Sequence, residues 1–176
     1  MEALARCRLP LQQVGLRQIG MTPAGLAAWT ASSAYGAANV VDMSDNALRV
    51  AGARALAAAD AGGAGDLTLA RTGLGPEGAV VLLSPGSRLA RWTRWLDLTG
   101  NGLGDEGVEA LAAVATGLVT LDLSANAITD DGVEHLAEAR WPVLLEAAGF
   151  EVRALMVDVW DEAGEEIPTF LGVKPG

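Results

Sequence analysis

The chain has 176 residues, a formal net charge of −10 and a hydrophobic fraction of 51%, which suffices for one domain or one short repeat array. Twelve basic residues against 22 acidic ones disfavour nucleic acid and membrane surfaces as partners, because both require clustered cations. Charged residues interrupt every long apolar stretch, so no run reaches the roughly 18 residues of a membrane span.

The N-terminal residues do not have the layout of a secretory signal. Glu2, Arg6, Arg8 and Pro10 interrupt the stretch that would have to be apolar, so we expect a cytoplasmic setting. Cys7 is the only cysteine, which excludes an internal disulfide and a cysteine metal site. One lysine among many arginines, alanines and glycines suggests a bacterial gene. We interpret residues 1–13 as an N-terminal cap.

From residue 14 to about residue 140 the sequence repeats one pattern five times. Each copy has an apolar residue, a second one two positions later, usually Asn at the fifth position after the start, an apolar residue at the seventh and Gly at the eleventh. The copies start at Val14, Val41, Leu67, Leu96 and Leu121, so they are 27, 26, 29 and 25 residues apart. The clearest copy contains Leu96, Leu98, Asn101, Leu103, Gly107 and Leu111.

Each copy predicts a strand, a turn and a helix. Apolar residues two positions apart are typical of a short strand with one buried side. The Asn that follows can donate to and accept from backbone in the next unit, and its loss would leave buried groups unpaired at about 1–3 kcal/mol each. This predicts a ladder of Asn46, Asn101 and Asn126, from which Thr72 departs. Acidic residues or Pro, as at Asp105, Asp130 and Pro76, then mark the start of a helix.

A unit of this size cannot bury its own apolar face, so the units must stack. The pattern resembles leucine-rich repeat proteins, and the helix in each unit with its Gly resembles the ribonuclease-inhibitor-like subfamily. The resemblance implies an α/β fold, a right-handed solenoid of about five repeats with parallel strands on the concave face and helices on the convex face. It also implies a non-catalytic protein-binding module without cofactors.

Two segments depart from the repeat. The third unit is the longest and predicts an extra loop, Ser84 to Arg94. Either this loop covers Trp92 and Trp95, or Trp95 is free to anchor an interface, and both alternatives are open. From Trp141 the period fails, and we interpret 141–176 as an atypical C-terminal unit with a helix from Pro142 to Ala148. There, a strand from Val152 to Trp160 and a partner strand from Glu165 to Val173 are expected to form a hairpin.

Residues next to the apolar strand positions should project from the concave face. These include Arg17, Ser44 and Ala70, and the proposed partner-binding residues Asp42, Thr68, Trp95, Asp97 and Asp122, with Arg71 in the adjacent loop. A column of Asp42, Asp97 and Asp122 favours a basic protein partner, although Leu-Asp-Leu-Ser is also common family consensus. Trp95 is of the residue type that anchors interfaces. Five strands give a face of only about 300 Å², against about 800 Å² for a standard interface, so adjacent loops should contribute.

Alternative functions remain open at this point. Gly73, Gly75 and Gly78 have the spacing of a dinucleotide-binding turn, but the neighbouring unit has Asn101-Gly-Leu-Gly at the same place, so the repeat's own turn also accounts for them. A faint resemblance of Leu144 to Val152 to a methyltransferase element is the other basis for a cofactor-binding enzyme. His135 stands without a second His or Cys, which favours a surface role over a metal site. A structural role, with docking or self-association through the C-terminal unit, is the main alternative to partner binding.

Overall fold

Short strands with one buried side alternate with amphipathic helices along most of the chain. The computed structural model describes residues 11–59, 64–112, 118, 120–138, 154–160 and 166–171, the last two ranges and residues 137–138 as backbone only. The predicted helix at 142–148, the faint methyltransferase element and most of the predicted cap at 1–13 lie outside these residues. In chain order the elements are β1 (Gln13–Gly15), α2 (Pro23–Thr30), α3 (Ser33–Ala37), β2 (Val40–Asp42), α4 (Arg49–Ala57), β3 (Asp66–Thr68), α5 (Gly75–Leu83), α6 (Leu89–Trp92), β4 (Trp95–Asp97), α7 (Gly104–Ala112), β5 (Thr120–Asp122), α8 (Asp130–Glu138), β6 (Ala154–Trp160) and β7 (Glu166–Leu171).

The strands form a single sheet in chain order, seven strands among the residues described. Strands β1 to β6 run parallel, and β7 pairs antiparallel with β6. The register aligns the predicted start of every copy: Val14, Val41, Leu67, Leu96 and Leu121. The predicted strands and the predicted C-terminal hairpin are therefore confirmed by the pairing.

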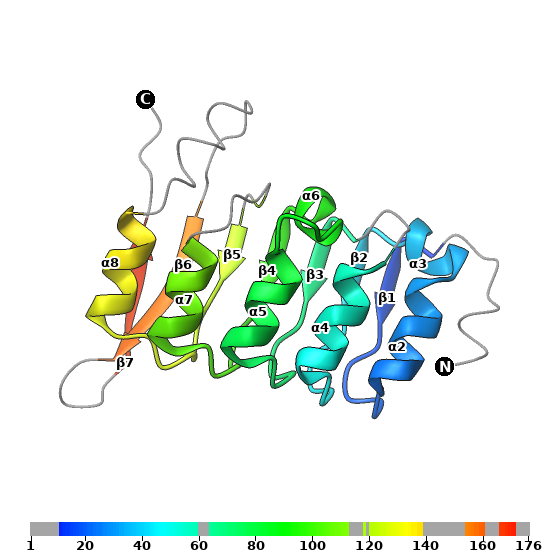
Figure 1. The fold of residues 1–176 in the computed structure, drawn as a ribbon, viewed down its shortest axis with the longest axis horizontal. Coiled ribbons are helices and arrows are strands. Elements are labelled where there is room, and N and C mark those ends of the chain that lie inside the picture. Colours follow the sequence, from blue (N-terminus) through cyan, green and yellow to red (C-terminus); the bar gives the residue numbers. More distant parts are fainter. Residues whose placement is uncertain are drawn as a thin grey trace.

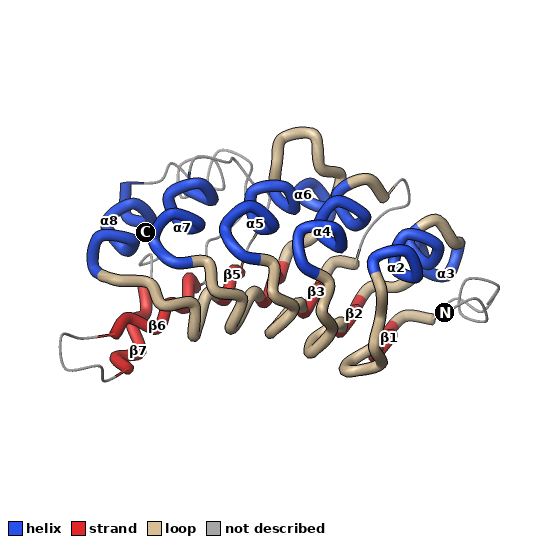
Figure 2. The backbone as a smooth tube through the Cα atoms, turned by 60° about the horizontal axis from the view of Figure 1, so that its bottom comes forward, coloured by secondary structure: helices blue, strands red, loops and turns tan. Residues whose placement is uncertain are grey.

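Helices and strands occupy separate layers. Figure 1 shows α2, α4, α5, α7 and α8 side by side on one side of the sheet, and Figure 2 shows the strands in a second row below them. A parallel sheet of this kind, with a helix after each strand, is an α/β repeat fold. Its opposite side, without helices, is available for other contacts.

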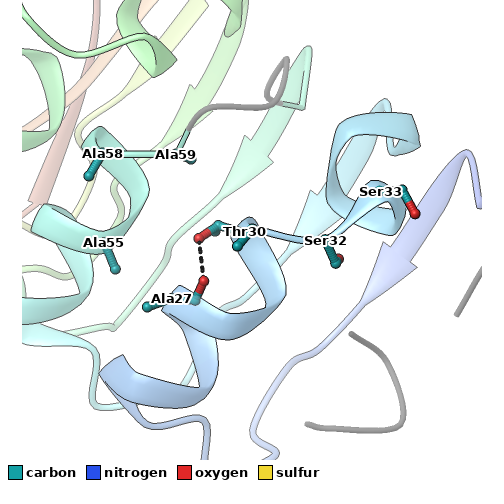
Figure 3. A pocket seen from close by; sticks show the side chains of 8 residues that line it. Ala27, Thr30, Ser32, Ser33, Ala55, Ala58 and Ala59 are labelled. Atoms are coloured by element: carbon teal, nitrogen blue, oxygen red, sulfur yellow. Dashed lines mark hydrogen bonds between the residues drawn. The ribbon is translucent and has the colours of Figure 1, made fainter. Parts of the chain in front are cut away.

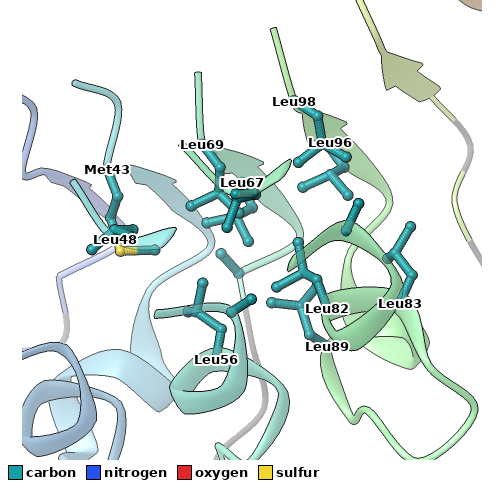
Figure 4. Packing of buried hydrophobic residues seen from close by; sticks show 14 of the residues in the cluster. Met43, Leu48, Leu56, Leu67, Leu69, Leu82, Leu83, Leu89, Leu96 and Leu98 are labelled. Carbon is teal, nitrogen blue, oxygen red and sulfur yellow. The ribbon is translucent and has the colours of Figure 1, made fainter. Parts of the chain in front are cut away.

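The core lies between the two layers and is built from equivalent positions of successive units. In every unit the apolar residue at the centre of the strand and the one two positions later are buried, such as Leu96 and Leu98. The apolar residue of the turn and one inward residue of the helix are buried as well. In the helix layer these are Trp29, Leu56, Leu82, Leu111 and Leu136. Figure 4 shows Leu67, Leu69, Leu96 and Leu98 above Leu56, Leu82 and Leu89. Burial of this continuous stripe provides the main driving force for stacking.

The helix starts agree with their sequence signals. Thr22 caps α2 by accepting the Gly25 amide at 3.1 Å, and Pro23 occupies the first turn. Asp105 and Asp130 lie in the first turns of α7 and α8, where the helix dipole favours negative charge. Helix α7 is amphipathic, because Val108 and Leu111 are buried while Glu109 is exposed.

The segment from Ser84 to Arg94 does not cover Trp92, so that alternative is wrong. It contains a short helix, α6, whose Leu89 and Ala90 are buried. It also leaves Trp92 58% exposed, because the apolar side of α6 is already satisfied by Leu89 and Ala90. The extra residues do not act as a cover, because α6 packs its own small apolar side on the core and directs Trp92 outward.

Candidate protein-binding face

The side of the sheet without helices carries two columns of side chains, which we call the strand face. One column is formed in register by Gly15, Asp42, Thr68, Asp97 and Asp122. The other is formed by Gln13, Val40, Asp66, Trp95 and Thr120. Neighbouring residues in a column are about 4.8 Å apart. The structure thus brings together five of the seven predicted partner-binding residues: Asp42, Thr68, Trp95, Asp97 and Asp122.

Trp95 lies at the centre of the acidic part of the strand face. Its neighbours in register are Asp66 and Thr120, and Asp97 stands on the same side two residues further along β4. The Trp95 side chain is partly exposed, so its indole remains accessible beside these carboxylates. An indole face next to negative charge can bind a cationic side chain by combined cation–π and ionic attraction.

The aspartates of the column also have a local structural role. Each carboxylate accepts a hydrogen bond from the backbone amide two residues ahead: Asp42 from Ser44 at 2.9 Å, Asp97 from Thr99 at 2.8 Å and Asp122 from Ser124 at 2.9 Å. This is the Asx turn that ends each strand. It supplies a structural reason for the recurrence of Asp and supports the family-consensus interpretation of the column.

The prediction that Ser44 and Ala70 project from the face is wrong. Both are buried, at 3% and 5% exposure. The chain has already left the strand at these positions, and their carbonyl oxygens accept amides of the preceding unit, Gln18 on Ser44 and Asp45 on Ala70. The Ser44 hydroxyl turns back to Asp42 at 2.6 Å. Simple alternation holds within the three-residue strands but not in the turn that follows.

Arg17 and Arg71 meet at a residue that the sequence argument did not single out. Asp45 accepts the Arg17 Nε at 2.7 Å through Oδ2, and the Arg71 Nε at 2.6 Å and Nη2 at 3.0 Å through Oδ1 and Oδ2. The cluster therefore ties the first three units together across the turn edge of the sheet. The sequence contains one signal for this cluster. Asp45 and Arg71, which have opposite charges, hold the same position in consecutive units.

The charges of this cluster shift the pKa values of Asp45 and Arg71. Hydrogen bonding from Arg71, reinforced by Arg17, lowers the pKa of the Asp45 carboxyl. The Asp45 carboxylate in turn raises the pKa of Arg71, with smaller contributions from Asp97 and Asp42. Arg71 thus lies within electrostatic reach of the Asp column and offsets part of its negative charge.

Buried asparagines link the turns of successive units. Asn101 is buried, accepts the amides of Thr72 and Leu74 at 3.1 and 3.2 Å, and donates to the carbonyls of Leu69 and Leu98 at 2.9 and 2.8 Å. Asn46 and Asn126 make the equivalent bonds to their preceding units. Each side chain therefore fastens one turn to the turn before it.

Thr72 joins this ladder on one side only. Its hydroxyl donates to the Leu69 carbonyl of its own unit at 2.7 Å, and its amide donates to Asn101. Among the described hydrogen bonds, none runs from the Thr72 side chain to the second unit, because the short hydroxyl lacks the reach of an amide. The departure noted in the sequence is therefore a physical break in the ladder.

The glycines with dinucleotide-type spacing belong to the repeat's own turn. Gly73 and Gly75 have φ of +69° and +64°, and Gly102 and Gly104 have φ of +67° and +57° at the same positions of the next unit. Left-handed backbone of this kind favours glycine. The recurrence accounts for the spacing without a nucleotide, and it supports the interpretation of the motif as a turn.

Neither of two surface pockets in the described part of the chain is lined by a recognisable set of catalytic side chains. One of about 540 Å³ lies between α2, α3 and α4 and is lined by small side chains, including Ala27, Thr30, Ala55 and Ala58 (Figure 3). Another of about 500 Å³ lies beside Asp45 and Arg71. Within the described ranges, no group of three or more His, Cys, Asp or Glu could hold a metal ion. His135 lies on α8 and is partly exposed.

The fold and its ladder define an α/β repeat protein, and the family comparison agrees. Residues 95–112 and 116–137 each match the family model described as Leucine Rich repeat, which supports a leucine-rich repeat protein. Such domains generally mediate protein–protein interaction, and the family is typically non-enzymatic. No curated protein matches the chain. Of the helices in the described part of the chain, none combines the length and apolar character needed to cross a membrane.

Proposed function

We propose that this chain is a non-catalytic module that binds a protein partner through the strand face and the loops beside it. The observation that carries the proposal is the position of Trp95, a partly exposed indole held between Asp66 and Thr120 with Asp97 beside it. Partly exposed Trp side chains are typical anchors of interfaces. We further propose the ribonuclease-inhibitor-like architecture, a right-handed solenoid of about five repeats.

The charge of the face favours a basic partner. Asp66, Asp97 and Asp122 surround Trp95, and parallel strands place Asp97 directly beside Asp122. Two carboxylates at about 5 Å in water repel each other by less than about 1 kcal/mol. A Lys or Arg side chain placed over Trp95 would relieve this repulsion while it contacts the indole. Binding should therefore weaken as salt is raised.

The area of the face requires contributions from its margins. The strand face of the five regular units measures about 300 Å², below the roughly 800 Å² that one partner contributes to a standard interface. The cluster of Arg17, Asp45 and Arg71 borders the face at the turn edge and fixes the loops there. We include Arg17 and Arg71 in the proposed surface as its margin.

A pull-down from a lysate of the source organism tests this proposal. The sheet variant carries Trp95→Ala, Asp97→Asn and Asp122→Asn, which removes the indole and two charges but keeps an oxygen for each Asx turn. The matched control carries Glu109→Ala and Glu134→Ala, which removes two exposed carboxylates from the helix layer. We expect wild type and control to retain a partner that the sheet variant loses. A partner retained by all three would contradict the proposal and move the binding site elsewhere, including the C-terminal unit.

A further inference from the structure

The segment around α6 is the densest cluster of basic residues in the sequence of this acidic chain. Arg88, Arg91 and Arg94 fall within seven residues, and no acidic residue occurs between Glu77 and Asp97. We call Arg88, Arg91, Trp92 and Arg94 the α6 corner. Figure 1 shows α6 at the edge of the sheet where β3 and β4 begin, separate from the row formed by the long helices.

The α6 corner is fixed by packing on the core and by hydrogen bonds to the segment before β3. Leu89 is 2% exposed and belongs to the core. The Thr93 hydroxyl donates to the Ala64 carbonyl at 3.1 Å, and the Arg94 amide donates to the Gly65 carbonyl at 2.7 Å. Both bonds reach the segment before β3. The exposure of Trp92 is therefore imposed by the fold around it.

The exposed side chains of the corner are of the types that dominate binding energy at interfaces. Trp92 is 58% exposed, and the only other exposed large apolar side chain in the described residues is Ile19. Arg91 is also exposed. A guanidinium fork matches a carboxylate in a bidentate arrangement, and an indole offers a broad apolar surface with one N–H donor. Trp and Arg are the residues most enriched at interface hot spots.

We propose that the α6 corner is a second docking site that binds a short acidic segment of a protein partner. A carboxylate of the segment pairs with Arg91, and an apolar side chain of the segment packs against Trp92. The site is distinct from the strand face, since it has the opposite charge and different side chains. A partner that engages both would present a basic surface next to an acidic segment.

The surroundings favour a short segment over a long polyanion. The corner leads directly into β4, where Trp95 pairs in register with Asp66 and Asp97 follows. These carboxylates lie within a few residues of Arg94. The Debye length at physiological salt is about 8 Å, so nearby charges still act on a bound ligand. A nucleic acid continuing past the corner would meet this negative charge. A peptide with a few carboxylates can end before it.

Fluorescence anisotropy with a labelled decapeptide, glutamates with a central leucine, tests the proposal on the full chain. Loss of binding in variants of the corner, and not in a matched variant elsewhere, assigns the peptide to the corner. We expect binding that is lost at about 0.5 M salt and weakened about tenfold or more by Arg91→Glu and by Trp92→Ala. The control Arg49→Glu makes the same charge change at an exposed arginine at the start of α4 and should alter affinity by less than about twofold.

Further measurements distinguish this proposal from its alternatives. Absence of peptide binding to wild type, or equal losses in Arg91→Glu and Arg49→Glu, would overturn the proposal. Tight binding of an oligothymidylate that depends on Arg91, without peptide binding, would also overturn it in favour of nucleic acid. The sheet variant with Trp95→Ala should still bind the peptide, so the corner and the strand face can fail independently. Circular dichroism confirms that each variant is folded, and Arg91→Glu alone suffices if Trp92→Ala does not fold.

Discussion

Asn101 links three successive units through one buried side chain and its own amide. Its carboxamide contacts the backbone of the third and fourth units, and its backbone amide donates to Asn126 of the fifth at 2.8 Å. Loss of this side chain leaves the buried amides of Thr72 and Leu74 without their acceptor. Single residues of this kind, repeated at fixed spacing, hold the turns of the fold in register.

Asn101→Ala is expected to lower the free energy of unfolding by about 1–3 kcal/mol, because the buried amides of Thr72 and Leu74 lose Asn101 Oδ1 as their acceptor. Urea denaturation monitored by circular dichroism measures the change. The control is Asn39→Ala, whose exposed amide donates only to Gln12 and should alter stability by less than about 0.5 kcal/mol. Equal midpoints for Asn101→Ala and wild type would contradict a structural ladder.

Thr72→Asn is expected to repair the break in the ladder. The longer amide could donate to the Met43 carbonyl and accept the Asn46 amide, as Asn101 does with Leu69 and Thr72. Net gains from such hydrogen bonds are about 0.5–1.5 kcal/mol, so the urea midpoint should rise. Thr72→Ser keeps a short hydroxyl and serves as the control. A midpoint for Thr72→Asn at or below wild type would show that the turn cannot accommodate the amide.

Asp45 gives a prediction about pH. Because its pKa is lowered in the folded protein, first by Arg71 and then by Arg17, Asp45 contributes stability at pH values above its unfolded pKa of about 3.9. This contribution is lost as the pH falls through the lower folded pKa. Arg71→Gln should raise the Asp45 pKa toward its ordinary value, more than Arg17→Gln does.

An NMR titration of the Asp45 carboxyl carbon measures this pKa in each variant. Arg54→Gln is the control, because Arg54 pairs with Glu77 on the helix layer and not with Asp45. An Asp45 pKa that is unchanged in Arg71→Gln would show that the ion pair does not form in solution.

At the scale of the element, α7 packs closely on α5 because it carries a glycine near its start. A Cβ added at Gly107 of α7 would lie 3.2 Å from Pro76 Cα of α5 and 3.0 Å from Leu103 Cβ. The first of these is a backbone atom of the neighbouring helix, which cannot move aside alone. Gly107 therefore sets the separation of α5 and α7, whereas an added Cβ at Gly52 or Gly78 would meet Leu48 or Leu74 of its own unit.

Gly107→Ala should therefore destabilise the fold by about 1–3 kcal/mol through overpacking, although alanine is the better helix former. Thermal denaturation measures the effect. Gly86→Ala is the matched control, since a Cβ there meets no atom within 4 Å. A melting temperature for Gly107→Ala at or above wild type would mean that the helices separate without cost.

The regular elements could be predicted from sequence, whereas the irregular ones could not. The apolar positions that repeat at fixed offsets determine β1 to β5 and their register, because only one alignment buries them all. The short helices α3 and α6 have no such repetition. Each buries only a few side chains, such as Ala34 and Tyr35 in α3, which is too weak a pattern to distinguish from a loop.

At the scale of the whole molecule, the candidate site was predicted in part. Alternation within the strands placed Asp42, Thr68, Trp95, Asp97 and Asp122 on one face, and the register brings them together. Asp45 was missed because its importance depends on two arginines one unit away in either direction, a relation between turns that a strand pattern does not contain. The exposure of Trp92 was missed because it depends on how α6 packs.

The central claim is that the partner binds the strand face, and site-specific photo-crosslinking tests it most directly. A photoreactive residue replaces Thr120, which neighbours Trp95 in register, and in a second variant it replaces the exposed Glu109 of the helix layer. Both are incubated with the partner that wild type captures. We predict a covalent adduct from position 120 and none from position 109. An adduct from position 109 alone would contradict the account and place the partner on the helices.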